Sequence, residues 1–336
     1  MNRLIMHQKK KLILSKKERL LALKNALRYF PKNQHQFLIQ EFKDELERFG
    51  KIYMYRFKPN YKLKARSLKD FPHTSKQAAS IMMMISNNLD NSVAQHPDEL
   101  ITYGGNGSVF QNWAQYLITM QYLSKMNNKQ TLVLYSGHPL GLFPSNENAP
   151  RVIITNGMMI PNYSKTEDLN KLNALGVTQY GQMTAGSFMY IGPQGIVHGT
   201  TITILNASRM LKTKSQQSKL FVSSGLGGMS GAQPKAAKIA GLISITAEVN
   251  QKVIEKCLEQ GWIDEFSNNL NYLIRRLKKA YAAKEIIALG FHGNVIDLWE
   301  KLYKEGVFVD IGSDQTSLHN PFHGGYYPNK LSFEKS

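Results

Sequence analysis

The sequence contains only one cysteine, Cys257, and no long apolar run. A single cysteine excludes an internal disulfide framework and a metal site built from several cysteines. The lack of about 18 consecutive apolar residues argues against a membrane span. The remaining composition, 42% hydrophobic and 20% charged over 336 residues, is that of a soluble globular chain, and the length suits about two domains.

Acidic residues are also scarce, above all near the amino terminus. The chain has 42 Lys and Arg against 24 Asp and Glu, a net charge of +18, and residues 1–70 hold 19 of the basic and only 6 of the acidic side chains. Such a basic stretch is either a solvated surface or a contact for a polyanion such as RNA. We favour the solvated surface, and we expect no nucleic-acid partner and no membrane partner.

The residue composition of the first half of the chain changes near residue 100. Helical spacing of apolar residues predicts helices over 20–30, 34–49 and 75–88, and a strand is expected over 52–57. From Ile101 to Gly199 glycines recur beside amide, hydroxyl and aromatic side chains. These glycines mark either ordinary turns or loops shaped around a polar ligand.

The stretch after Lys219 follows the βαβ pattern of dinucleotide-binding folds. A predicted strand over 220–223 leads into the glycine-rich run 225–231, a predicted helix over 232–242 and a second strand over 243–247. In such units a pyrophosphate lies against the glycine loop and the helix N-terminus. Glu248 ends the second strand about 20 residues after the glycines, where an acid accepts the ribose hydroxyls and disfavours the 2′-phosphate of NADP.

The same alternation continues toward the carboxyl end. A helix over 266–283, a strand over 286–291, a helix over 295–304 and a strand over 307–311 are predicted, with Asn294 and the run 315–319 at strand ends. From the residues alone, the default inference is a hydride-transferring dehydrogenase. No histidine and carboxylate spacing indicates a metal, and nothing around Cys257 favours a nucleophilic thiolate.

Six motifs in order connect this sequence to a known family. They are YGGNG at 103–107, SGHP at 136–139, YGQMTAGS at 180–187, YIGPQGIVHGT at 190–200, SGLGGMSGAQPKA at 224–236 and GSDQTSLHNP at 312–321. Together they resemble the urocanase (urocanate hydratase) family from about Leu20 to the last residue. The resemblance implies an α/β fold, with a basic extension over 1–19, a partial urocanase core domain over 20–191 and a Rossmann-like NAD-binding domain with a parallel sheet over 192–336.

The resemblance also implies an activity. Urocanases are hydro-lyases of histidine degradation that add water to urocanate, giving 4-imidazolone-5-propanoate, and their tightly bound NAD⁺ acts as an electrophile rather than a redox carrier. On this basis we expect a cytoplasmic homodimer that takes urocanate as its small-molecule substrate. No metal is expected.

Carried over residue by residue, the resemblance predicts a set of NAD contacts. They are Gly104, Gly105, Gln182, Gly228, Met229, Ser230, Glu248, Asn294, Val295, Gln315, Thr316, Ser317, Leu318, His319, Tyr326 and Tyr327. Bacterial members have an arginine five residues after the ribose acid, where this chain has Val253. Tyr103 is a candidate to face the substrate.

Family members continue well beyond the segment that matches Leu331–Phe333, and their active-site cysteine region lies in that continuation. The catalytic residues are therefore unknown from this sequence. We expect the NAD domain to be incomplete at its carboxyl end and the chain alone to be inactive. The alternative is a truncated, non-catalytic NAD-binding fragment of a urocanase.

Overall fold

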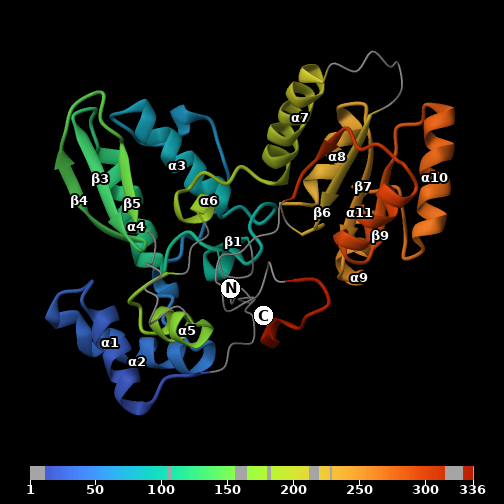
Figure 1. The fold of residues 1–336 in the computed structure, drawn as a ribbon. Coiled ribbons are helices and arrows are strands. Elements are labelled where there is room, and N and C mark those ends of the chain that lie inside the picture. The colour runs from blue at the N-terminus through green and yellow to red at the C-terminus, as the bar shows by residue number, and fades with distance from the viewer. Residues whose placement is uncertain are drawn as a thin grey trace. The chain divides into compact units, whose positions relative to one another are not determined.

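The computed structural model describes residues 12–103, 107–155, 165–179, 183–211, 219–227, 229–314 and 328–335 (Figure 1). The chain divides into two compact units, Met1–Ile191 and Gly192–Ser336. Each unit has its own hydrophobic clusters and is described by itself. No helix among the described residues is long and apolar enough to cross a membrane.

The first unit begins with two packed helices, α1 (Lys16–Leu27) and α2 (Lys32–Phe49). Ser15 caps α1 by a reciprocal pair of hydrogen bonds with Glu18, so the helix starts four residues before the predicted position. Leu14 is 3% exposed and packs with both helices. The boundary expected between residues 19 and 20 therefore falls inside α1.

The strand predicted over 52–57 is wrong. Tyr55–Phe57 forms a short 3-10 helix, and Met54 before it has a left-handed φ of 57°. The buried carboxylate of Glu45, on α2, accepts hydrogen bonds from the backbone N–H groups of Tyr53, Met54 and Tyr55 at 2.7–2.8 Å. Because one side chain takes three consecutive donors, none of them is left for a sheet partner.

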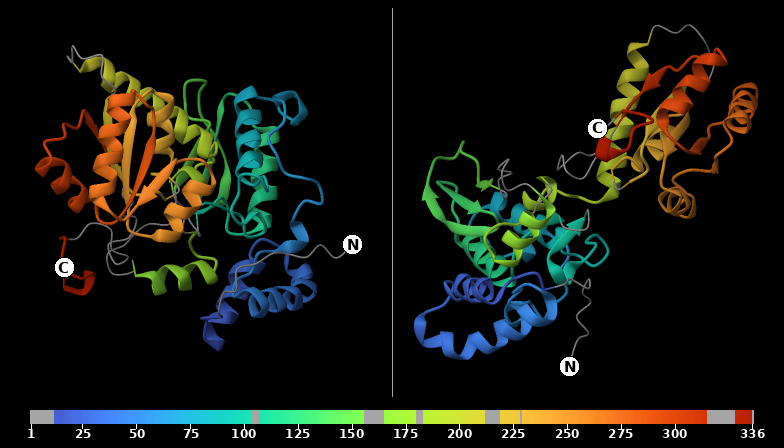
Figure 2. Two further views of the ribbon diagram at one scale, coloured as in Figure 1. Left: turned by 90° about the vertical axis from the view of Figure 1, so that its right-hand side faces the viewer. Right: turned by 60° about the horizontal axis from the view of Figure 1, so that its bottom comes forward.

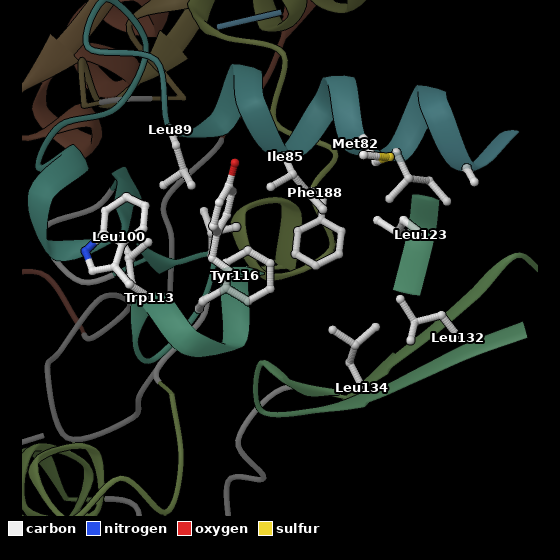
Figure 3. Close-up of a cluster of buried hydrophobic side chains, with 14 of the residues drawn as sticks. Met82, Ile85, Leu89, Leu100, Trp113, Tyr116, Leu123, Leu132, Leu134 and Phe188 are labelled. Atoms are coloured by element: carbon white, nitrogen blue, oxygen red, sulfur yellow. The ribbon is translucent and has the colours of Figure 1, made fainter. Parts of the chain in front are cut away.

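A second layer of the first unit combines two helices with a sheet. Helices α3 (Lys76–Asn88) and α4 (Trp113–Lys125) pack against a three-stranded sheet of order β4-β3-β5. The strands are β3 (Gln130–Tyr135), β4 (His138–Pro144) and β5 (Val152–Thr155). Figure 3 shows Met82 and Ile85 of α3 facing Leu132 and Leu134 of β3 across this core.

The remaining elements of the first unit are short, and the glycine-rich sequence from 101 onward runs through them. They are β1 (Ile101–Tyr103), β2 (Gly107–Ser108), α5 (Thr166–Ala174) and α6 (Met183–Gly186), with 3-10 turns η2 (Leu68–Asp70) and η3 (Pro97–Glu99).

The second unit is built on a five-stranded parallel sheet of order β10-β6-β7-β9-β8. The strands are β6 (Leu220–Ser224), β7 (Ile243–Glu248), β8 (Glu265–Ser267), β9 (Ala288–His292) and β10 (Ile311–Gly312). The helices are α7 (Pro193–Met210), α8 (Ala232–Ile239), α9 (Gln251–Glu259), α10 (Leu270–Ala283) and α11 (Val295–Lys304), and η6 (Phe333–Lys335) follows. The predicted α/β class with a parallel sheet is confirmed.

Helices cover both faces of this sheet (Figures 1 and 2). Leu220, Val222 and Ile245 point to the face packed by α10 and α11. Phe221, between two of them in sequence, packs on the opposite face with α7 and α8. This alternation explains why β6 begins with three consecutive apolar residues.

Two predicted elements of the second unit need correction. The helix expected over 266–283 begins only at Leu270, because Asn269 caps it and Glu265–Ser267 forms strand β8 instead. The strand expected over 307–311 is reduced to Ile311–Gly312. Val307 and Val309 still pack against the core, but only these two strand residues pair with β6.

Candidate functional site

The glycine loop joins the carboxyl end of β6 to the start of α8. Gly225 has a φ of +80° and donates its N–H to Ala247 O at 2.7 Å, which holds the loop against β7. A Cβ on Gly231 would lie 2.9 Å from Gly227 O and 3.0 Å from Leu226 O. Both positions thus require glycine, the first for its backbone conformation and the second for close backbone approach.

In its described part, the loop presents one open backbone donor near the helix start, because Gly231 N, Ala232 N and Gln233 N already donate to carbonyls of the loop and Pro234 has no N–H. Met229 is 42% exposed, and its backbone N–H has no acceptor among the described residues. No side chain caps α8, which begins directly after Gly231. A helix N-terminus and an open amide favour an anion such as a diphosphate.

Glu248 lies beside this loop at the end of β7, where the count from the glycines predicted it. Its Oε2 accepts a hydrogen bond from Leu226 N at 2.7 Å, and its Oε1 accepts one from Asn250 N at 2.8 Å. A carboxylate has about four acceptor positions, so two remain for the hydroxyls of a ribose. Glu248 therefore also fixes the conformation of the loop, a role that the sequence did not reveal.

The order of the strands places this loop at a switch point. The chain leaves β6 toward β7 on one side, and β10 later pairs with β6 on its other side. Open α/β sheets bind ligands outside the carboxyl ends of strands at such a point. Ser224, the last residue of β6, donates its hydroxyl hydrogen to Asp314, which follows β10 and links the two strand ends. Sequence reasoning did not assign Asp314 a role.

Asn294 and Val295 occupy the strand end after β9. The side-chain oxygen of Asn294 accepts from Ile296 N at 2.9 Å and caps α11, and Val295 packs against the core. Gly293 N donates to Glu248 O at 3.0 Å, which ties this turn to the end of β7. These contacts account for both residues structurally and leave the Asn294 amide nitrogen as a donor.

Cys257 lies beneath the glycine loop. Its thiol is 6% exposed and donates to Leu226 O at 3.3 Å. Burial, and next the charge of Glu248, raise the pKa of the Cys257 thiol. The neutral thiol thus supports the loop, and its surroundings do not stabilise a thiolate.

Three glycine-rich motifs of the first unit contact one another through Tyr103, Thr184 and Tyr190. Tyr103 Oη and Thr184 Oγ1 are 2.6 Å apart, and the rings of Tyr103 and Tyr190 are 4.6 Å apart between centroids. Burial, and next Tyr103, raise the pKa of Tyr190. The structure thereby groups two hydroxyls and two aromatic rings from segments about 80 residues apart, the kind of surface that binds a polar ring compound.

The SGHP motif carries a buried polar network that sequence reasoning did not interpret. Gln111 N donates to Gln115 Oε1 at 2.8 Å, so Gln115 Nε2 is fixed as the donor to Tyr29 Oη, also at 2.8 Å. The Tyr29 hydroxyl oxygen lies 2.7 Å from His138 Nδ1, within hydrogen-bond distance. The network therefore links the SGHP motif to the end of α1 and to α4 through Tyr29 and Gln115.

Many predicted contacts fall outside the described residues. They are Gly104, Gly105, Gln182, Gly228, Gln315, Thr316, Ser317, Leu318, His319, Tyr326 and Tyr327. Within the described ranges, no group of three or more His, Cys, Asp or Glu side chains is arranged to hold a metal ion.

A parallel sheet with a glycine loop at its switch point defines a Rossmann-like α/β protein. Two family models match the chain: the Urocanase N-terminal domain over residues 63–189 and the Urocanase Rossmann-like domain over residues 192–336. The chain therefore belongs to the urocanase family.

Individual relatives agree with the family assignment. The chain is 60% identical to the probable urocanate hydratase of Dictyostelium discoideum over 322 residues. This alignment covers 95% of this chain and 48% of that protein. It is 58% identical over 329 residues to the urocanate hydratases of Mus musculus and Homo sapiens, covering 96% of this chain and 49% of each. The chain thus spans about half the length of these relatives.

Proposed function

We propose that the chain serves as a urocanate hydratase, a hydro-lyase of histidine degradation that adds water to urocanate to give 4-imidazolone-5-propanoate. The observation that carries this proposal is identity of 58–60% to relatives named urocanate hydratase, extending across both units. The homodimer, the cytoplasmic location and urocanate as substrate are part of the same proposal.

The strand-end site of the second unit fits NAD⁺ as cofactor. Gly228, Met229 and Ser230 would hold the diphosphate at the start of α8, and Glu248 would accept hydrogen bonds from the adenosine ribose. Asn294, Val295 and the predicted contacts beyond Asp314 would border the rest of the dinucleotide, together with Gly104, Gly105 and Gln182. When bound, NAD⁺ supplies an electrophilic nicotinamide ring.

The chain's own residues would bind the cofactor and orient the substrate. Glu248 holds the glycine loop through Leu226 N, and its remaining oxygen positions would meet the ribose without rearrangement. The hydroxyls of Tyr103 and Thr184, which contact one another, would face the urocanate ring and keep it in one orientation.

Calorimetric titration with NAD⁺ tests the cofactor assignment. Glu248→Gln keeps the size of the side chain but removes its charge, so NAD⁺ affinity is expected to fall about tenfold, since a hydrogen bond to a charged group contributes roughly 1.5–3 kcal/mol. Glu255→Gln on the neighbouring helix α9 makes the same change and should leave affinity unaltered. Equal affinities of the wild-type chain for NADP⁺ and NAD⁺, or a Glu248→Gln variant that binds normally, would contradict the assignment.

The second candidate is a non-catalytic NAD-binding fragment, favoured by the match to about half of each relative. The loss of urocanate's ultraviolet absorbance distinguishes the two. The chain is assayed with NAD⁺, alone and mixed with the carboxyl-terminal half of the Dictyostelium relative. Urocanate consumption beyond that of the added half alone supports the hydratase, whereas NAD⁺ binding without consumption in either mixture supports the fragment.

A further inference from the structure

The sheet β4-β3-β5 of the first unit is apolar on both of its faces. None of its three strands contains Lys, Arg, Asp or Glu. Leu132 and Leu134 of β3 point into the core formed with α3 and α4 (Figure 3). Val133 and Tyr135, which alternate with them, point the other way. A sheet with one face in water alternates apolar and polar residues, whereas a sheet covered on both faces is apolar throughout. The strand sequences therefore indicate a sheet with both faces covered.

The side of the sheet away from α3 and α4 has no such cover. We call it the outer face and define it by Val133, Tyr135, Phe143 and Ile153. These residues are neighbours, because Ile153 pairs with Val133, and Phe143 pairs with Thr131 two positions earlier on the same strand. Tyr135, Phe143 and Ile153 are 45–48% exposed. Within the described residues, the outer face joins none of the hydrophobic clusters of the first unit. The first unit therefore leaves one apolar face of this sheet open.

The size of the outer face indicates what covers it. Three strands about 4.8 Å apart, each about five residues long, give a face on the order of 250 Å². A stable protein–protein interface buries about 800 Å² on each partner, so a second copy that rested on this face alone would form too small a contact. One α-helix, about 10–12 Å in diameter, covers most of such a face. The outer face therefore suits a further layer of the same domain better than a second copy of the chain.

The relatives of this chain have enough further chain to supply such a layer. Their alignments cover 95–96% of this chain but only 48–49% of the relatives. We propose that the outer face is the docking surface for an amphipathic helix from the half of the urocanate hydratase chain that this sequence does not match. The proposal rests on membership of the family and not on the activity proposed above, so a failure of urocanate hydration would leave it standing.

The chemistry of the outer face defines the docking side of this helix. Because the three strands carry no charged residue, a charged side chain docked against them would be buried without a partner, which is unfavourable. The docking side is therefore apolar. Its one polar requirement is a hydrogen-bond partner for the Tyr135 hydroxyl, because a buried tyrosine usually keeps such a partner.

Hydroxyl-radical footprinting, which reports how exposed a side chain is to solvent, tests the proposal. The full chain is compared with a chimera, a single polypeptide in which this chain continues into the unmatched half of the Dictyostelium relative. Tyr135 and Phe143 should be modified at least about fivefold more slowly in the chimera, because a covered contact excludes water. Phe37 on α2, 65% exposed and outside the outer face, should be modified alike in both proteins.

Every other pattern of modification would overturn the proposal. Rapid modification of Tyr135 and Phe143 in both proteins would mean that the outer face stays in solvent. Slow modification in the chain alone at every concentration would mean that the second unit covers it. Slowing in the chain alone only as its concentration rises would mean that a second copy does. If the chimera does not fold, footprinting the full-length Dictyostelium relative at the aligned positions makes the same comparison.

A lysine on the outer face provides a second test. Ile153→Lys should hardly change the urea midpoint of the chain alone, because Ile153 is about half exposed there. In the chimera the ammonium group would be buried without a partner, so the midpoint should fall and Tyr135 should regain its reactivity. Leu20→Lys on α1, 66% exposed and outside the outer face, should have neither effect. An equal fall of the midpoint in the chain alone and in the chimera would contradict the docking.

Discussion

In the second unit the polar side chains that matter gather where parallel strands end, whereas in the first unit they lie inside, bonded to the backbone of distant segments. Glu248 and Asp314 are examples of the first arrangement. Glu45 and Gln111 are examples of the second. The difference shows that one unit gathers polar groups at strand ends, where open parallel sheets bind ligands, while the other uses them mainly to set its own conformation.

The same contrast appears in the sheets. The five parallel strands of the second unit are covered on both faces. The sheet β4-β3-β5 of the first unit packs one face on α3 and α4, while Tyr135, Phe143 and Ile153 are 45–48% exposed. The conformation of the second unit is therefore set mainly by its regular layers, and that of the first unit more by individual side-chain contacts.

The largest expected effect is on stability, from a substitution that removes the internal hydrogen bonds of Glu45 in the first unit. Glu45→Ala leaves two buried N–H groups and one partly buried N–H group without an acceptor, so we expect a loss of unfolding free energy on the order of 3 kcal/mol. Urea unfolding followed by Trp113 emission in a background lacking Trp262 and Trp299 measures it. Glu47→Ala on the exposed side of α2 should lower the unfolding free energy only slightly. Equal losses of unfolding free energy in the two variants would show that the backbone hydrogen bonds of Glu45 do not stabilise the fold.

The next effect concerns the strand-end loop of the second unit. Gly231→Ala places a methyl group 2.9 Å from Gly227 O and should cost about 1–3 kcal/mol. Gly227→Ala is the matched control for stability, because a Cβ there meets nothing within 4 Å. Urea unfolding followed by Trp262 and Trp299 gives both values, and a Gly231→Ala variant as stable as the control would contradict the close approach.

The smallest effect is the pH dependence from His138. Burial, and next the charge of Arg28, lower the pKa of His138 from its ordinary 6.5. The unfolded chain therefore binds a proton at His138 more readily than the folded chain. The stability that the neutral His138 ring contributes is complete above about pH 6.5 and is lost as pH falls below it. His138→Gln should remove this part of the pH dependence. Parallel stability curves for variant and wild type between about pH 7 and pH 5 would contradict it.

How far the sequence could predict the fold depended on how local the determining contacts were. The helix over 295–304 was predicted to the residue because Asn294 caps it and its apolar spacing is regular. The segment 52–57 looked like a strand because its apolar and aromatic residues suit one, and the carboxylate that prevents pairing belongs to another helix.

The candidate site shows the same limit. Counting from the glycines was enough to place Glu248 at a strand end. Its contact with Leu226, the Cys257 thiol under the loop and the Ser224–Asp314 bond join residues 22, 31 and 90 positions apart. No local pattern encodes such pairs, so the sequence predicted where the site lies but not what holds it together.

The central claim is that the strand-end loop of the second unit binds NAD⁺, and amide hydrogen exchange measures this directly. With saturating NAD⁺, the amides of residues 225–231 and those at the end of β7 should exchange more slowly, because a bound dinucleotide covers them and accepts from the open Met229 N–H. The sheet β4-β3-β5 serves as the internal reference. Slowed exchange at 225–231 is the predicted result, and unchanged exchange there at saturating NAD⁺ would contradict the account.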